Sequence, residues 1–167
     1  MFFGVSTLQT FHVLISLVAI ASGIVVVWGL ITSRPFGALT AVFLVTTLLT
    51  NLTGFLFPFN GFTPAIGVGI VGTIVVALCL LARYPMRMQQ GWRGVFVVTA
   101  VISLYLNLFV LVVQLFLKVP ALHAYAPTGS EPPFAVAQGL VLIACVLAGI
   151  IAYRRFRRSP PAGATAA

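Results

Sequence analysis

The sequence predicts an all-α integral membrane protein, a bundle of five transmembrane helices with its N-terminus outside the cell and its C-terminus in the cytoplasm. Three observations lead to this prediction. Hydrophobic residues make up 61% of the 167 positions and charged residues 6%, whereas soluble domains average about half and about a quarter. Five apolar segments are each long enough to cross a hydrocarbon core of about 30 Å, which takes roughly 20 helical residues. Basic residues also gather in alternate connections between these segments.

The five apolar segments follow one another with short interruptions. We expect the spans at residues 8–32, 36–57, 64–82, 92–117 and 134–153. The sequences between them, SRPFG, FPFNGFTP, RYPMRMQQGWR and VPALHAYAPTGSEPP, are rich in proline and glycine, as turns are. The first segment is not preceded by the basic region of a cleaved signal peptide, so we expect it to be retained as a helix. Residues 1–158 form one predicted domain, and residues 159–167 a disordered tail.

The charged residues predict the orientation and the partner. The arginines fall in the first and third connections and after the last span: Arg34, Arg83, Arg87, Arg93, Arg154, Arg155, Arg157 and Arg158. The other connections carry a single basic residue, Lys118. The positive-inside rule therefore places the arginines in the cytoplasm. A net charge of +8 would suit nucleic acid in a soluble protein. Its position beside apolar spans instead predicts binding to anionic lipid headgroups, and no nucleic acid.

Polar side chains gather in the predicted outer half of four spans. The candidates for a ligand pocket are His12, Ser16, Asn51, Asn107, Gln114 and Gln138. One interpretation is that these groups bond one another across helices and fix the packing. The other is an outward-facing pocket for haem, a quinone or a proton path, because ionisable groups inside a membrane often mark functional sites. Threonines of the second span need neither, since their hydroxyls can bond carbonyls of their own helix.

Two histidines and the single acid are candidates for a metal or haem site on the outer side. His12, His123 and Glu131 could form a set of two imidazoles and a carboxylate, or the two histidines could bind haem iron. Their spacing is not diagnostic of either. His12 can instead donate to an interhelical partner, His123 can lie at the interface, and Glu131 can complement the start of the last helix together with Ser130.

The sequence argues against an enzyme without excluding one. A single acidic residue in the chain excludes catalysis by paired carboxylates, and no nucleophile motif or phosphate-binding loop is present. Cys79 and Cys145 lie within apolar spans, and we expect them to be packed thiols.

Small residues predict where the helices approach each other. Ala65, Gly69, Thr73 and Ala77 recur every four residues in the third span, and Ala144, Ala148 and Ala152 do so in the fifth. Such spacing lets two backbones come close, which drives helix association in lipid. We expect both rows to be packing seams.

Three segments, FHVLISLVAIASGIVVVWGL, TTLLTNLTGFLFPF and VTAVISLYLNLFVLVVQLFLKVPALHAYAPTGSEPPFAVAQG, resemble a group of small bacterial inner-membrane proteins of unknown function. The resemblance implies a multi-pass protein of the bacterial plasma membrane, and it assigns no role to any residue. Three functions stay open: a ligand-binding or redox-associated accessory subunit, a small proton-coupled transporter, and a scaffold or assembly protein without a ligand. Each could operate as a homo-oligomer or within a larger membrane complex.

Overall fold

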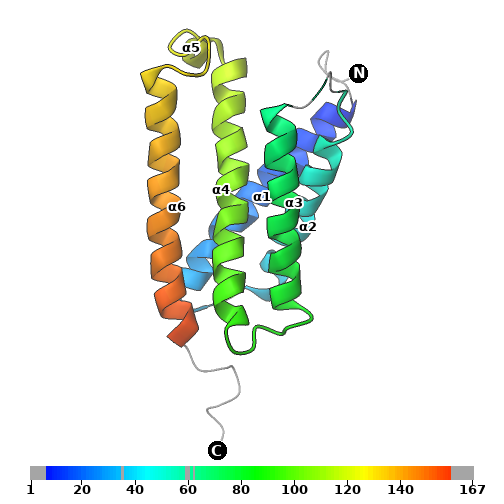
Figure 1. Cartoon of the computed structure of the whole chain (residues 1–167), viewed down its shortest axis with the longest axis vertical. Helices are drawn as coiled ribbons and strands as arrows, with labels where there is room; N and C mark the ends of the chain where they lie inside the picture. Colours follow the sequence, from blue (N-terminus) through cyan, green and yellow to red (C-terminus); the bar gives the residue numbers. More distant parts are fainter. Residues whose placement is uncertain (1–6, 35, 59–60, 62, 159–167) are drawn as a thin grey trace, which may run out of the picture.

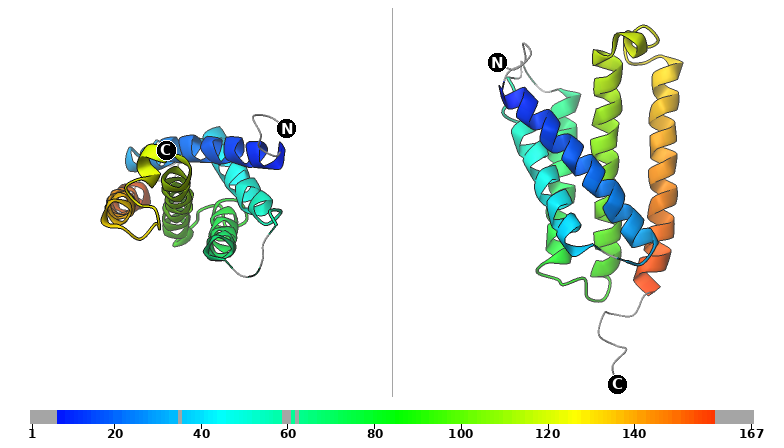
Figure 2. Two further views of the ribbon diagram at one scale, coloured as in Figure 1. Left: turned by 90° about the horizontal axis from the view of Figure 1, so that it is seen from above. Right: turned by 180° about the vertical axis from the view of Figure 1, so that it is seen from behind.

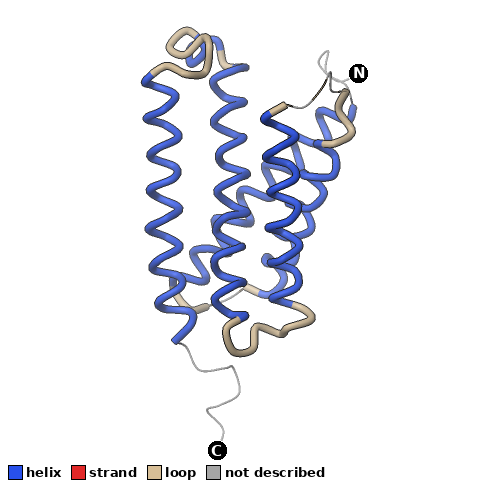
Figure 3. The backbone as a smooth tube through the Cα atoms, viewed as in Figure 1, coloured by secondary structure: helices blue, strands red, loops and turns tan. Residues whose placement is uncertain are grey.

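The computed structural model describes residues 7–34, 36–58, 61 and 63–158. The helices in this part of the chain are α1 (Thr7–Ile31), α2 (Gly37–Gly54), α3 (Pro64–Arg83), α4 (Trp92–Lys118), α5 (Pro120–His123) and α6 (Pro132–Arg158). All except α5 are long and apolar enough to cross a membrane, and the described residues contain no strand. The all-α class and the five spans are confirmed, as Figure 3 shows along the chain. The predicted tail at 159–167 lies outside the described residues.

The helix boundaries have local causes. The hydroxyl of Thr63 accepts a bond from the backbone N–H of Ile66, and Pro64 follows in the first turn, so α3 begins with a standard cap. Val119 is extended because it precedes Pro120, and this ends α4. Pro120 then opens α5, a single turn that lies within the predicted loop. At the other end of the chain, α6 continues to Arg158, five residues past the predicted end of the span.

Helices α3, α4 and α6 stand side by side, α2 is inclined to them, and α1 crosses the bundle at an angle (Figures 1 and 2). Seen from above, α1 lies along one side of the row formed by α2, α3, α4 and α6. It begins beside α2 and ends beside α6, with α4 between, and it packs against all three. Helix α4 also contacts α3 and α6, so it is the centre of the bundle. The tilt of α1 leaves the half of α4 nearest α5 less covered than the other half.

Glycines let the helices approach closely. A Cβ added at Gly23 of α1 would lie 2.7 Å from Cε2 of Phe43 in α2 and 3.0 Å from Cδ1 of Leu104 in α4. Phe43 is completely buried, so three helices meet at this glycine. At Gly94 of α4, an added Cβ would lie 2.8 Å from Cε2 of Tyr153 in α6. These close approaches provide the van der Waals contact on which helix association in lipid depends.

The predicted seam on α3 is wrong. Ala65 and Ala77 are exposed, and the buried face of the helix carries Gly72, Val76, Cys79 and Ala82. Gly69 does pack against the ring of Phe55, and α3 as a whole contacts both α2 and α4. On α6 only Ala152 of the predicted row is buried, while Ala144 is exposed. The two cysteines are buried free thiols, as expected.

The charges separate to the two ends of the bundle (Figure 1). The α1–α2 connection, the α3–α4 connection and the end of α6 lie together, and we call this the arginine end. It carries Arg34, Arg83, Arg87, Arg93, Arg154 and Arg155, whereas the side chains of Arg157 and Arg158 lie outside the described residues. Lys118 and Glu131 belong to the opposite end, which we call the α5 end.

Candidate functional site

Most hydroxyl groups on α2 are satisfied within the helix. The hydroxyls of Thr40, Thr46, Thr50 and Thr53 each donate to the carbonyl four residues earlier, at 2.7 to 2.8 Å. This confirms the expectation that threonine hydroxyls of the second span can bond carbonyls of their own helix. Thr47, on the same helix, instead accepts a bond from α4.

His12 contacts α2 through a ring nitrogen and also packs against Phe57, in the connection that follows α2. Its Nδ1 lies 2.8 Å from the hydroxyl oxygen of Thr53, and its ring meets Phe57 edge to face at 5.2 Å between centroids. Thr53 has one hydroxyl hydrogen, which it donates to the carbonyl of Leu49 at 2.7 Å. For both bonds to form, His12 must carry its hydrogen on Nδ1 and donate it to Thr53. The imidazole is therefore held at the contact between α1 and α2 with Nε2 as an acceptor.

Asn107 links α4 to α2. Its amide nitrogen donates to the hydroxyl of Thr47 at 3.2 Å, and both residues are buried. Ser103 lies one turn away on α4 and is also buried, but its hydroxyl has no hydrogen-bond partner among the described residues. The bond between Asn107 and Thr47 is thus an interhelical contact in the middle of the bundle.

Asn51 of α2 faces α3. Its amide packs against Gly72 of α3, where an added Cβ would lie 3.1 Å from Nδ2 and 3.2 Å from Oδ1. The Nδ2 atom is buried and has no hydrogen-bond partner among the described residues. Asn51 therefore packs against a neighbouring helix, without a bond from Nδ2 among the described residues.

The remaining pocket candidates do not join this group. Gln138 of α6 donates from Nε2 to the carbonyl of Phe109 in α4 at 3.1 Å, and its Oε1 is buried without a partner in the described part of the chain. Ser16 donates to the carbonyl of Val13 on its own helix at 2.8 Å. Gln114 is exposed, because α1 diverges from this part of α4. The predicted polar layer is thus divided into separate contacts between pairs of helices.

The loop at the α5 end holds its own carboxylate. Glu131 accepts bonds from the N–H and the hydroxyl of Thr128, at 3.0 and 2.9 Å, and from the N–H of Ser130 at 3.0 Å. Desolvation acts to raise the pKa of Glu131, but these bonds together outweigh it and hold that pKa below its usual range. Glu131 therefore orders the turn before α6.

The predicted metal set is not assembled in the described residues. They contain no group of three histidine, cysteine or acidic side chains that could hold an ion. Nδ1 of His123 lies 3.2 Å from the carbonyl of Phe116, at the end of α4, while His12 contacts α2. The oxygens of Glu131 are engaged by the loop.

A groove between α4 and α6 was not predicted. Its volume is about 540 Å³, and its walls repeat at helical spacing on both helices. Val98, Val101, Ile102 and Tyr105 come from α4; Leu142, Cys145, Val146, Gly149, Ile150, Tyr153 and Arg154 come from α6. A smaller hollow of about 330 Å³, lined by Gly91, Gly94, Val95 and Thr99, shares Val98 and Tyr153 with it. Neither hollow is lined by a predicted pocket residue.

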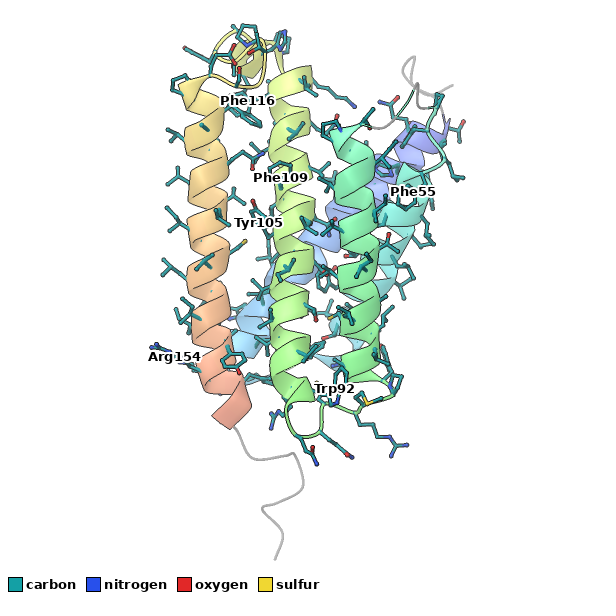
Figure 4. The ribbon with its side chains drawn as sticks, in the orientation of Figure 1. Phe55, Trp92, Tyr105, Phe109, Phe116 and Arg154 are labelled. Carbon is teal, nitrogen blue, oxygen red and sulfur yellow. The ribbon has the colours of Figure 1, made fainter. Side chains whose placement is uncertain are left out.

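The groove lies between two tie points. Towards the α5 end, α4 and α6 are joined by the Gln138–Phe109 bond and by an edge-to-face contact of Phe116 with Phe134, 5.5 Å between centroids. Towards the arginine end, Tyr153 packs on Gly94. Figure 4 shows Tyr105 in the space between the two helices and Arg154 at the arginine end of α6. Since the walls are ordinary apolar residues, only Gly149 could have indicated the hollow from the sequence.

The chain was compared with protein-family models, curated protein sequences and solved structures. None of the three comparisons found a match. The resemblance to small bacterial inner-membrane proteins stays a prediction, and any function must be inferred from the geometry of the bundle itself.

Proposed function

We propose that this chain is a non-hydrolytic accessory or assembly subunit of a bacterial plasma membrane, in which the polar side chains hold the helices together. The observation that carries this proposal is that three of the six predicted pocket residues each bond a group on another helix. His12 bonds Thr53, Asn107 bonds Thr47, and Gln138 bonds a carbonyl of α4. Each contact joins two different helices, which is how polar groups stabilise membrane bundles.

The proposed orientation has the arginine end in the cytoplasm. Its support is the separation of the eight arginines from Lys118, since positive charge is retained on the cytoplasmic side. Thr128 and Gln89 are exposed at opposite ends of the bundle, so cysteines placed there in turn test the orientation. In whole cells, a membrane-impermeant maleimide should label Thr128→Cys and spare Gln89→Cys. The reverse pattern would overturn the orientation.

The assembly function is tested with the full chain, extracted from its native membrane in a mild detergent. We expect it to elute with a larger complex of defined composition, and to do so equally with Asn107→Leu at a temperature where the variant is folded. A chain that elutes alone, or as a homo-oligomer without other proteins, would contradict an accessory role.

A second function is favoured by three of the four buried side-chain polar atoms that the packing leaves unsatisfied in the described residues, the fourth being Nε of Arg83. Asn51 Nδ2, Ser103 Oγ and Gln138 Oε1 are buried without hydrogen-bond partners among the described residues. Buried groups of this kind are costly unless a water, an ion or a ligand satisfies them. They would suit a quinone-like guest or a proton path in a redox-associated subunit or a small proton-coupled transporter.

The second function has its own test. Haem gives an absorption band near the violet end of the visible spectrum that His12→Ala or His123→Ala should remove, and a quinone appears in an organic extract of the purified chain. Transport predicts a proton-dependent flux in proteoliposomes that Asn107→Leu abolishes and Gln114→Leu, at an exposed position, preserves. A colourless protein that yields neither quinone nor flux would exclude this function.

A further inference from the structure

The groove between α4 and α6 has the form of a binding site for a slender apolar group. Its floor is buried, with Val101 and Cys145 only 7% and 8% exposed, while Val98 and Val146 on its rim are 45% and 49% exposed. Gly149 lowers one wall, because its absent side chain leaves the facing methyl of Val101 3.4 Å from where a Cβ would lie. The volume of about 540 Å³ falls within the range of about 300 to 1,000 Å³ that small-molecule sites occupy.

The length of the groove matches one leaflet of a bilayer. The α4 wall of the groove, from Val98 to Tyr105, rises by about 10 Å at 1.5 Å per residue, and the α6 wall, from Leu142 to Arg154, by about 18 Å. One leaflet provides about 15 Å, half of a hydrocarbon core of about 30 Å. Towards the α5 end, the contact of Gln138 with Phe109 closes the space between the helices. A transmembrane helix would need a partner surface along both leaflets, whereas an acyl chain needs only one.

Charge at the arginine end of the groove selects the headgroup. Arg154 lines the groove and is exposed, and it follows directly after Tyr153 at the arginine end of α6. The only acidic residue of the chain, Glu131, lies at the opposite end in the loop before α6. No aspartate or glutamate of this chain can therefore neutralise Arg154, and an anionic group from outside the chain is the complementary partner.

We propose that the groove binds one acyl chain of an anionic phospholipid from the leaflet at the arginine end, with the phosphate of that lipid beside Arg154. Tyr153, packed on Gly94, borders both hollows. It marks the level at which the acyl chain of the lipid joins its headgroup. The proposal requires that the helices span a bilayer. It does not require that the protein assembles with other proteins, so it can fail or hold independently of the accessory role.

The test uses the purified full chain in phosphatidylcholine vesicles that contain a phosphatidylglycerol with a diazirine in one acyl chain. After irradiation, mass spectrometry of the digested protein should map adducts to α4 and α6 residues of the groove, Val101 and Cys145 among them. The same diazirine on phosphatidylcholine measures the preference for the anionic headgroup. Adducts spread evenly over exposed apolar faces, those of α3 included, would show ordinary boundary lipid and overturn the proposal.

Matched variants locate the two parts of the site. Gly149→Leu should remove the groove adducts of both lipids, whereas Gly139→Leu should retain them, because nothing lies within 4 Å of an added Cβ at that position on the same helix. Gly149→Ala should also retain the groove adducts, because the added Cβ would make only an ordinary contact with Val101. This variant shows whether a change at this position disturbs folding without filling the groove. Arg154→Gln should lower the preference for phosphatidylglycerol about fivefold, the ratio expected for one basic residue at a membrane surface. Arg34→Gln, at an exposed arginine of the α1–α2 connection that does not line the groove, should lower it by less than Arg154→Gln does.

Two other results would overturn the proposal. Equal preference in Arg154→Gln and the parent chain would show that the arginine does not select the headgroup. If the groove gains no lipid adducts and a bifunctional crosslinker joins the α6 of one copy to the α4 of another, a second copy of this chain covers the groove.

Discussion

Gly23 offers the sharpest test of the packing, because three helices meet there. In Gly23→Ala the new Cβ would lie 2.7 Å from Cε2 and 3.0 Å from Cδ2 of Phe43, and 3.0 Å from Cδ1 of Leu104. Ordinary contacts begin at about 3.4 Å, so α1 must move by several tenths of an ångström or the ring must turn. Phe43 is completely buried and has no free space to enter. Overpacking of this kind costs about 1 to 3 kcal/mol.

A graded series of alanine substitutions isolates this cost from the general effect of replacing glycine in a helix. Gly149→Ala meets Val101 at 3.4 Å, and Gly139→Ala meets nothing within 4 Å. All three substitutions gain the same helix propensity, at most about 1 kcal/mol. We expect the free energy of unfolding, measured by steric trapping in bicelles, to fall at Gly23 alone relative to the other two. Equal values at the three sites would refute the packing of α1 against α2 and α4.

Three further outcomes are expected from the contacts. His12→Leu should lower the free energy of unfolding by about 1 kcal/mol, since it removes the bond to Thr53, and an unchanged value in the same assay would argue against that contact. Gln114→Leu should change it by less than about 0.5 kcal/mol because the side chain is exposed, and a large loss would mean that Gln114 has a buried partner. The pKa of Glu131 is lowered in the folded state. The carboxylate therefore stabilises the loop fully at a pH above the usual glutamate pKa, and this stabilisation is lost as the pH falls through the lowered pKa. The amide resonances of Thr128 and Ser130 should titrate together there, and Glu131→Gln should abolish the transition; a midpoint above the usual range would contradict the bonding.

The spans could be predicted from the sequence because each backbone must satisfy its own hydrogen bonds in lipid, which forces long apolar helices. The separation of Arg34 and Arg154 from Lys118 could be predicted for a similar reason, since charges must lie at helix ends. The threonines of α2 could be predicted from local chemistry alone: a hydroxyl one turn away from a carbonyl needs no tertiary contact.

The partners of the polar residues could not be predicted from the sequence. Helical spacing shows which residues share a face of a helix, but it does not show which other helix packs against that face. Asn107 and Gln114 lie on one side of α4, yet one is buried and the other exposed. Asn107 meets Thr47 of α2, whereas α1 diverges from the part of α4 that carries Gln114, and this tilt has no periodic signal in the sequence. The same limit explains α3, where the row through Ala65 and Ala77 has ideal spacing while Gly72 makes the contact with Asn51.

The contact between Asn107 and Thr47 decides whether the buried polar groups hold helices together or await a guest. A double-mutant cycle with Asn107→Leu and Thr47→Val measures the coupling between them. Because the two atoms lie 3.2 Å apart in a buried contact, we expect a coupling of about 0.6 to 1.7 kcal/mol, the range found for interhelical bonds in membranes. A coupling of zero, with both single variants as stable as the parent chain, would contradict the structural role proposed for the polar residues.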